Sequence, residues 1–324
     1  MKVELGKIAL FGAAGAIGNS IASALREKGR KYRVVGRGRG SLEKAFGGDP
    51  LAEIVTWDPD DAASVRTAAR GVDTLVYLVG VPYDHFELHP VVMKKTLDGA
   101  IADGVKRVVL IGTVYPYGRP QTAMVAESHP REPHTFKGKM RKEQEEVLLK
   151  AHAEGKIQVT ILRLPDFYGP GVSASFLHKL FEAAVKGGAA DMVGPIDVPH
   201  EFVYVPDVGP TVLALAEQSE AYGRWWHFAG AGTAMTQREI ATKVFAMAGR
   251  KPKLRVAGKM MLRVIGLFNP FMRELVEMNY LVTTPVLMDD KALHALLGGV
   301  KKTSYDDGLR MTPDSYRAAA ASAK

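Results

Sequence analysis

Three glycines, Gly12, Gly15 and Gly18, follow a short apolar run with the spacing G-x-x-G-x-x-G. In such a pattern the first glycine allows a sharp turn after a strand, the second lets the backbone approach a pyrophosphate, and the third permits close packing of a helix. The N-terminus of that helix offers unpaired N–H groups to phosphates. The pattern therefore predicts a dinucleotide site, and the alternative is a glycine turn that binds nothing. The contacts expected from this turn are Gly12, Ala14, Gly15, Ala16, Ile17 and Gly18.

Two arginines, Arg37 and Arg39, follow the second expected strand, which spans residues 32–35. The ribose next to adenine lies at this point in a dinucleotide site, where a carboxylate holds a 2′-hydroxyl and an arginine accommodates a 2′-phosphate. No carboxylate occurs between this strand and Glu43. The sequence therefore favours NADP(H) over NAD(H), with Arg37 as the first contact and Arg39 as the second. The alternative is that both arginines are solvated loop charges.

The elements that must position these residues alternate regularly through about residue 165. Apolar runs typical of buried strands occur at 8–11, 32–35, 53–56, 73–79, 106–112 and 157–162, with helical patterns between most of them. This alternation predicts an α/β fold of the Rossmann type, a doubly wound parallel sheet with helices on both faces. The ligand of such a sheet lies outside the carboxyl ends of its strands.

The pattern changes in the second half of the chain. A segment rich in Gly and Pro surrounds one expected helix at 173–186, and a strand at 201–205, a helix at 207–218 and a strand at 224–228 follow. We assign residues 1–165 to a dinucleotide-binding domain and residues 166–324 mainly to a smaller α/β substrate lobe, with a strand and helix near 200–228 returning to the first domain. Residues 259–282, rich in Met and Phe, are interpreted either as two amphipathic helices packed on the core or as a lid over an apolar carbonyl substrate.

The composition excludes several kinds of site. The 324 residues include no cysteine, so disulfides, thiolate catalysis and cysteine-ligated metals are excluded, and we predict no metal. No apolar run reaches about 18 residues, so we expect neither a membrane span nor a membrane partner. The first strand follows closely after Met1, so we expect no signal peptide and a cytoplasmic location. The net charge is +8; the basic residues look scattered and no nucleic-acid motif occurs, so we expect no nucleic-acid partner.

Several ordered motifs make the chain resemble the extended short-chain dehydrogenase/reductases, the group that contains NAD-dependent epimerases and dehydratases. The glycine turn GAAGAIG at 12–18, LIGTVYPYG at 110–118, RLPDFYGPG at 163–171 and HEFVYVPDVG at 200–209 are similar to motifs of that family. Asp58 falls where the family places a carboxylate on the adenine amino group. Beyond the glycine turn and the two arginines, the expected cofactor contacts are Asp58, Val79, Leu164 and Phe167.

The resemblance also implies a catalytic set, which is a Ser or Thr followed by Tyr-x-x-x-Lys. Thr113 falls at the hydroxyl position, and Lys139, with Glu143 four residues later, falls at the lysine position and would also bind the nicotinamide ribose. Thr135 then stands in place of the tyrosine, and its hydroxyl is too weak an acid to supply a proton near neutral pH. The candidate substitutes, in order of preference, are Tyr115, Tyr168, Tyr117 and His134.

The sequence therefore predicts an atypical NADP(H)-dependent oxidoreductase that acts on a small carbonyl or hydroxyl compound, with Thr113 polarising the substrate oxygen and Lys139 orienting the cofactor. Two alternatives stay open: a sugar epimerase or dehydratase that retains its NAD(P), and a non-enzymatic, NmrA-like protein that senses NADP. Asp166 in place of the family's Asn, and His200 where an arginine often holds a nucleotide-sugar phosphate, count against a nucleotide-sugar substrate. The resemblance further implies a homodimer formed through two sheet-flanking helices.

Overall fold

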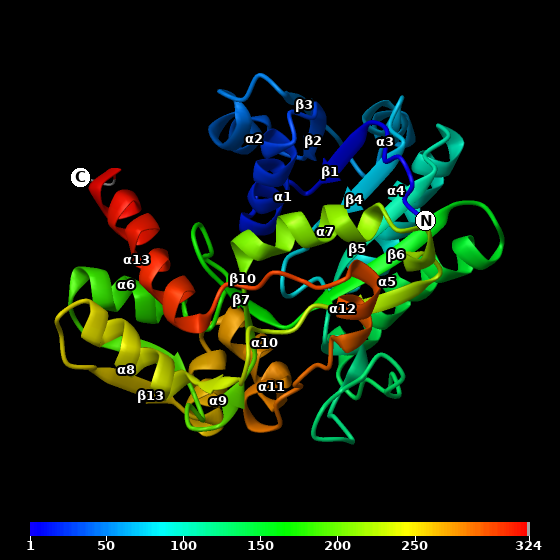
Figure 1. Ribbon diagram of the computed structural model, residues 1–324. Coiled ribbons are helices and arrows are strands. Elements are labelled where there is room, and N and C mark those ends of the chain that lie inside the picture. The colour runs from blue at the N-terminus through cyan, green and yellow to red at the C-terminus, as the bar shows by residue number, and fades with distance from the viewer. Residues whose placement is uncertain (323–324) are drawn as a thin grey trace.

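The computed structural model describes residues 1–322, and seven parallel strands form its central sheet (Figure 1). Their order is β11-β6-β5-β4-β1-β2-β3, so the direction of winding reverses between β1 and β4. A reversal of this kind defines the doubly wound, Rossmann-type sheet that the sequence predicts. The strands are β1 (Ile8–Phe11), β2 (Tyr32–Gly36), β3 (Ala52–Thr56), β4 (Thr74–Tyr77), β5 (Arg107–Thr113), β6 (Gln158–Leu164) and β11 (Arg224–His227).

Helices cover both faces of this sheet, which explains why its strands are nearly continuous apolar runs. One hydrophobic cluster joins the sheet to α1 (Ala16–Glu27), α2 (Arg39–Phe46) and α7 (Val208–Ala216). A second cluster joins the opposite face to α3 (Ala62–Ala69), α4 (Leu88–Ala102) and α5 (Phe136–Ala153). Figure 1 shows α1 and α7 side by side, although almost 200 residues separate them in the chain.

The sequence pattern places the strands of the sheet within about two residues of their observed ends, but it misses α2. Arg39, expected in a loop, is the first residue of that helix. Only Leu42 and Phe46, four residues apart, are buried in this short helix. Three apolar residues among eight, Leu42, Ala45 and Phe46, give too weak a helical periodicity to be noticed beside the neighbouring glycines.

The C-terminal half adds three small pairs of strands and a set of helices. The pairs are β7 (Asp166–Tyr168) with β10 (Phe202–Tyr204), β8 (Ala190–Val193) with β13 (Leu254–Ala257), and β9 (Pro199–His200) with β12 (Met235–Thr236). The helices are α6 (His178–Lys186), α8 (Gln237–Met247), α9 (Lys259–Gly266), α10 (Pro270–Met278), α11 (Tyr280–Thr283), α12 (Lys291–Leu297) and α13 (Tyr305–Ser322).

The helix ends in this half can be compared with the capping residues and prolines in the sequence. The capping box of Thr236 and Glu239 is formed at the start of α8, as the sequence predicts. The segment 259–282 is broken at residues 267–269, and Pro270 is the first residue of α10, where its missing N–H costs nothing. Pro313, expected to precede a terminal helix, lies inside α13.

The second half returns to the sheet through a close contact between α7 and α1. The Ser20 hydroxyl donates to the Pro206 carbonyl at 3.2 Å and accepts from the Gly209 N–H at 2.9 Å. A Cβ at Gly209 would lie only 2.2 Å from the Ser20 carbonyl oxygen, so glycine is required for this approach. The contact fixes the C-terminal half beside the glycine turn.

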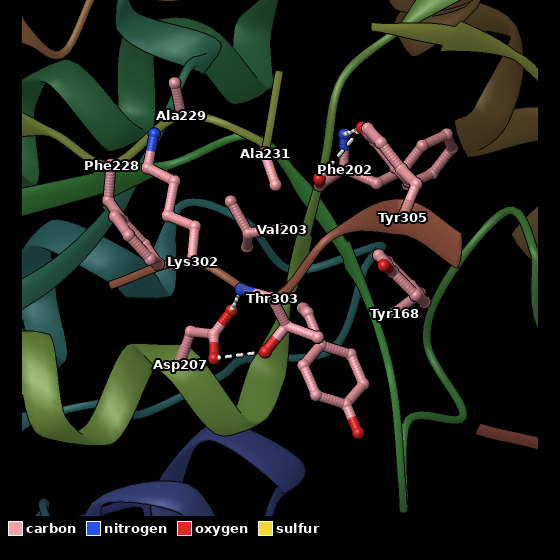
Figure 2. A pocket seen from close by; sticks show the side chains of 11 residues that line it. Tyr168, Phe202, Val203, Asp207, Phe228, Ala229, Ala231, Lys302, Thr303 and Tyr305 are labelled. Carbon is pink, nitrogen blue, oxygen red and sulfur yellow. Dashed lines mark hydrogen bonds between the residues drawn. The ribbon is translucent and has the colours of Figure 1, made fainter. Parts of the chain in front are cut away.

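The C-terminal segment is joined to the same region by a small polar cluster (Figure 2). The Asp207 carboxylate accepts from the Thr303 N–H at 2.6 Å and from its hydroxyl at 2.8 Å, and the Tyr305 hydroxyl donates to the Phe202 carbonyl at 3.0 Å. The cavity between these residues measures about 10 Å³, which is room for one water molecule. This cavity is therefore part of the joint between the lobes and too small to hold a substrate.

Glu201 gives this joint a pH dependence that can be measured. Burial raises the pKa of Glu201 to about 7, although its carboxylate accepts from the Met288 N–H at 3.0 Å. Because the folded state holds this proton more tightly than the unfolded state, the contribution of Glu201 to stability is greatest below about pH 4.5 and is lost as the pH rises through about 7. Glu201→Gln should remove up to about 3 kcal/mol of this decline. Urea unfolding from about pH 5 to about pH 8 measures it, and an unchanged pH slope would contradict it.

Candidate functional site

The fold requires glycine at two of the three positions in the glycine turn, Gly12 and Gly18, but not at Gly15. Gly12 has a φ of +85°, and a Cβ there would lie 2.8 Å from the backbone of Val79. A Cβ at Gly18 would lie 2.0 Å from the carbonyl oxygen of Ala13. Gly15, by contrast, has extended backbone angles and no atom within 4 Å of an added Cβ. The space above Gly15 is open, which suits a ligand that approaches the backbone closely.

The start of α1 behind this opening suits an anion. No side chain caps its N-terminus, and no acidic residue lies in its first turn. The free N–H groups and the partial positive charge of the helix are therefore available to a phosphate. Ala14 and Gly15 are exposed, and Ala16 and Ile17 are half-buried. The turn thus presents the open backbone surface that a pyrophosphate site needs.

The residues predicted to contact adenosine lie on the surface at the ends of β2 and β3. Arg37 and Arg39 are exposed, and Arg39 Nε donates to Glu43 at 2.8 Å. Asp58 follows β3 and is exposed, with its carboxylate accepting from the Asp60 N–H at 2.9 Å. The pairing with Glu43 leaves Arg37 as the better placed of the two arginines to receive a 2′-phosphate.

Residues predicted for the nicotinamide end come together at the same edge of the sheet. Thr113 ends β5 and is in register with Leu164, the last residue of β6. Val79 follows β4 and lies against the glycine turn, and Phe167 lies in β7. The Thr113 hydroxyl oxygen accepts from the Tyr115 N–H at 3.3 Å and keeps its own proton for another partner.

Thr135 and Lys139 lie in different surroundings at the start of α5, since Thr135 is buried and Lys139 is exposed. Thr135 is the N-cap of the helix, buried, with its hydroxyl oxygen accepting from the Gly138 N–H at 3.0 Å. Lys139 is exposed, in one stripe with Glu143, Glu146 and Lys150. The functional roles predicted for Thr135 and Lys139 therefore gain no support from the packing of α5.

The buried stripe of α5 instead carries Lys137, Arg141 and Glu145, again at four-residue intervals. The Lys137 side chain is 1% exposed, and its ammonium group donates to Glu277 at 2.9 Å and to Glu274. The same ammonium lies 5.0 Å from the ring centre of Tyr83. Lys137 is therefore a buried cation fixed between α5, α10 and the loop after β4.

The side chain of Arg141 extends from α5 to the C-terminal end of β5, two residues before Thr113. Its guanidinium donates to the Ile111 carbonyl at 3.2 Å and to His89 Nδ1 at 3.2 Å. Burial, together with the positive charge of Arg141, lowers the pKa of His89 to about 2, so this imidazole is neutral and accepts the hydrogen bond. Arg141 is thus a cation held two residues before the end of β5.

Glu145 completes the stripe as the acceptor for two arginines. Arg163 of β6 is fully buried and donates to Glu145 from Nε at 2.9 Å and from Nη2 at 2.5 Å. Arg131 donates to the same carboxylate at 2.9 Å. The guanidinium of Arg163 also lies 4.5 Å from the ring centre of Tyr117. Glu145 thereby fixes the inner face of α5 against β6.

A signal for this stripe is present in the sequence but was assigned differently. The segment TFKGKMRKEQE at 135–145 contains two overlapping sets with the family spacing, namely Thr135, Lys139 and Glu143, and Lys137, Arg141 and Glu145. Glu143, four residues after Lys139, favours the first set, and Glu145, four residues after Arg141, equally favours the second. The two sets differ in which side of the helix is buried: Lys137, Arg141 and Glu145 are buried, whereas Lys139 and Glu143 are exposed.

Tyr115, the first predicted substitute for the family tyrosine, lies in the turn η1 (Tyr115–Tyr117) that follows Thr113. Its ring stacks on Phe86 with centres 6.4 Å apart. Burial raises the pKa of Tyr115 well above its usual value, and the nearby Tyr83 and Asp166 add to this. A hydroxyl in this environment holds its proton tightly, which does not favour Tyr115 as the proton donor.

The other predicted substitutes lie in different surroundings. The hydroxyl of Tyr117 is buried and hydrogen-bonds His227 Nε2 at 2.5 Å. Tyr168 is buried, and a Cβ at Gly308 would lie 2.3 Å from its hydroxyl oxygen. His134 is exposed. Of these three, Tyr117 alone is shown beside the inner stripe of α5, through Arg163, and its hydroxyl is engaged with His227.

A second polar pair faces this region from the C-terminal half. His200 Nε2 lies 2.5 Å from a carboxylate oxygen of Asp166. His200 is buried, and its Nδ1 has no hydrogen-bond partner among residues 1–322. A buried ring nitrogen without a partner is costly, so it indicates a place for a water molecule or a polar group of a ligand. The described residues form no group of acidic and histidine side chains able to hold a metal ion.

Comparisons with other proteins bear on this arrangement. A model of the NAD dependent epimerase/dehydratase family matches residues 8–226. The dTDP-6-deoxy-L-talose 4-dehydrogenase (NAD(P)(+)) of Kitasatospora kifunensis is 25% identical over 228 residues, which are 66% of this chain and 71% of that protein. The uronate dehydrogenase of Pseudomonas putida is 30% identical over 138 residues, 41% of this chain and 50% of that protein. The structure of UDP-glucuronic acid 4-epimerase from Bacillus cereus in complex with NAD shares the fold, with a TM-score of 0.78 over 97% of this chain and 99% of that one at 18% identity.

Proposed function

Because the chain belongs to the NAD-dependent epimerase/dehydratase family and is an oxidoreductase of the extended short-chain dehydrogenase/reductase type, we propose that it transfers a hydride between NADP(H) and a small carbonyl or hydroxyl compound. The observation that supports cofactor binding most strongly is the open space above Gly15, a glycine that the fold does not need. Arg37 at the end of β2 supports the choice of NADP(H). The residues that would hold the cofactor are Gly12, Ala14, Gly15, Ala16, Ile17, Gly18, Arg37, Arg39, Asp58, Val79, Leu164 and Phe167.

In this proposal Lys137 takes the place of the family's tyrosine and Arg141 the place of its lysine. A lysine ammonium, like a tyrosine phenol, can give a proton to a reacting oxygen and take it back. The arrangement Lys137-x-x-x-Arg141-x-x-x-Glu145 satisfies the spacing that the resemblance implies, and all three side chains are buried. Lys139 keeps a weaker proposed role, as an exposed cation that binds the hydroxyls of the nicotinamide ribose.

Each residue near the nicotinamide end has a separate role in the proposed reaction. The bound nicotinamide supplies or accepts the hydride. Thr113 donates a hydrogen bond to the substrate oxygen, and the Lys137 ammonium gives that oxygen a proton in reduction or recovers it in oxidation. Arg141, fixed by Ile111 and His89, places positive charge beneath this point. The carboxylates of Glu274 and Glu277 hold the ammonium in place.

A sugar epimerase or dehydratase is the second candidate, because the similar proteins include a UDP-glucuronic acid 4-epimerase and a dTDP-sugar dehydrogenase. The Asp166–His200 pair weighs against an anionic nucleotide sugar. Its carboxylate would repel a phosphate, whereas the free Nδ1 of His200 suits a neutral hydroxyl or carbonyl group. We therefore favour a small neutral substrate.

Titration with NADPH and with NADH, followed by turnover on aldehydes, ketones and nucleotide sugars, tests the proposal. We expect NADPH to bind about tenfold more tightly than NADH, and Arg37→Ala to remove most of that difference because it deletes a charge-assisted contact. Arg39→Ala should have a smaller effect, since Arg39 already pairs with Glu43. Tight retention of the cofactor without net oxidation would support the epimerase, and binding without turnover on any compound would contradict an oxidoreductase.

A further inference from the structure

One stretch of the sequence contains an excess of basic residues equal to the net charge of the chain. Although basic residues occur throughout the chain, residues 240–273 contain eight Lys and Arg and no Asp or Glu. That excess equals the formal net charge of the whole chain, +8, so the remaining residues are balanced. Carboxylates outside the segment pair with three of its cations, Lys243 with Asp306, Arg255 with Asp191 and Arg273 with Glu274, so these three add less to the attraction of an anionic partner. The eight cations are Lys243, Arg250, Lys251, Lys253, Arg255, Lys259, Arg263 and Arg273.

The same segment exposes large apolar side chains on α9 and on the turn that follows it. Leu267 is 79% exposed and Phe268 is 88% exposed. Leu262 and Gly266 form the buried side of α9, and a Cβ at Gly266 would lie 2.9 Å from Arg273 Cα. A helix of a globular protein normally turns its apolar side inward, so an exposed apolar stripe indicates a partner. The other exposed members are Met260, Met261, Val264 and Ile265.

A pocket beside α9 adds a place for a negatively charged group. It has a volume of about 340 Å³ and lies between α9, α10, α11 and the start of α5. Arg119, Lys259 and Arg263 line it. The one carboxylate that lines it, Glu277, already accepts from Lys137. Three cations around one engaged carboxylate suit a phosphate group.

We propose that α9 and the turn 267–269 dock this protein on an anionic phospholipid membrane, with a lipid phosphate in the pocket of Arg119, Lys259 and Arg263. A helix with apolar residues on one side and basic residues beside them lies in the plane of a bilayer interface, and each basic residue near an anionic leaflet strengthens binding. No helix among the described residues is long and apolar enough to span a membrane, and contact in the plane of the interface needs none. A second copy of this chain is the poorer partner, because two such cationic surfaces repel each other.

The position of α9 determines which part of the protein would face the membrane. Figure 1 shows α9 at the lower edge of the molecule, away from β2 and β3. Helix α10, which packs against α9, carries Glu274 and Glu277 to Lys137. Helix α10 therefore contacts both the docking helix and the candidate proton donor, and the C-terminal half would face the bilayer.

Sedimentation with vesicles of phosphatidylcholine, with and without phosphatidylglycerol, tests the proposal on the full chain. We expect binding to the phosphatidylglycerol vesicles that weakens as salt is raised, because the attraction is partly electrostatic. The double variant Leu267→Ser, Phe268→Ser should lower the bound fraction on the order of tenfold by removing the inserted apolar area. Lys259→Gln with Arg263→Gln should lower it by a similar factor. Leu267 and Phe268 are 79% and 88% exposed, and Lys259 and Arg263 are also exposed, so neither double variant should affect folding.

Matched controls use residues of the same types elsewhere on the surface. Met311→Ser, on α13, removes an exposed apolar side chain, and Lys28→Gln, after α1, removes an exposed cation. Both should bind vesicles as the original protein does. The proposal is overturned if binding ignores phosphatidylglycerol, if controls and test variants behave alike, or if the apolar double variant changes only the mass of the protein in solution. That last result would identify the face as an interface between copies of this chain.

Discussion

Replacing Lys137 by glutamine is expected to lower kcat for carbonyl reduction by about 10²–10⁴-fold, the usual contribution of a positioned proton donor. Glutamine can still hydrogen-bond Glu274 and Glu277 but has no proton to give. NADPH affinity should stay within about threefold, because the glycine turn and α1 are untouched. Steady-state kinetics and a parallel titration measure the two effects separately.

Two further variants decide which residues of α5 are involved. Lys137→Tyr restores the acid that the family uses and should retain clearly more turnover than Lys137→Gln. Lys139→Gln distinguishes the two overlapping sets, since a large loss of kcat in this variant alone would show that Thr135 and Lys139 form the functional set. Lys150→Gln, exposed on the same helix, is the control for a general effect of removing a charge.

Glu145→Gln is expected to destabilise the protein by about 3–5 kcal/mol, the usual result of breaking a buried ion pair. The Glu145 side chain is 2% exposed and that of Arg163 is 0% exposed, so the variant leaves a buried guanidinium without its counterion. Arg131 loses a partner as well. The free energy of unfolding, measured with urea, gives the effect directly.

The next residue supplies a matched control. Glu146 has the same side chain on the same helix, but it is 51% exposed and its contact with Lys142 is long, 3.8 Å. Glu146→Gln should therefore cost less than about 1 kcal/mol. Equal effects at the two positions would show that the buried pair adds nothing to stability.

The sequence predicts those parts of the fold whose signals are local. The strands of the sheet are buried on both faces, so each is an apolar run that needs no other information, and the Thr236–Glu239 capping box marks the start of α8. The glycine spacing locates the turn, but only the structure shows that Gly12 and Gly18 serve the fold while Gly15 does not.

The choice of the side of α5 that we propose to be catalytic depends on a property that residue spacing does not contain. Lys137 and Lys139 both fit a four-residue repeat, and the choice between them requires knowing which side of the helix faces α4 and β5. The Asp166–His200 pair is likewise formed by two strands 34 residues apart, so neither residue by itself indicates a partner. The exposed stripe of α9 was interpreted as packed or as a lid because apolar helices are usually buried.

Gly15→Ala, titrated with NADPH beside the unaltered protein, tests the central claim most directly. An alanine fits the extended backbone at this position and meets no atom within 4 Å, so the thermal midpoint should not change. Its methyl group would occupy the space meant for the pyrophosphate, and we expect the affinity to fall at least about tenfold. Unchanged affinity in the variant, or no binding of NADPH or NADH by the unaltered protein, would contradict a dinucleotide site at this turn.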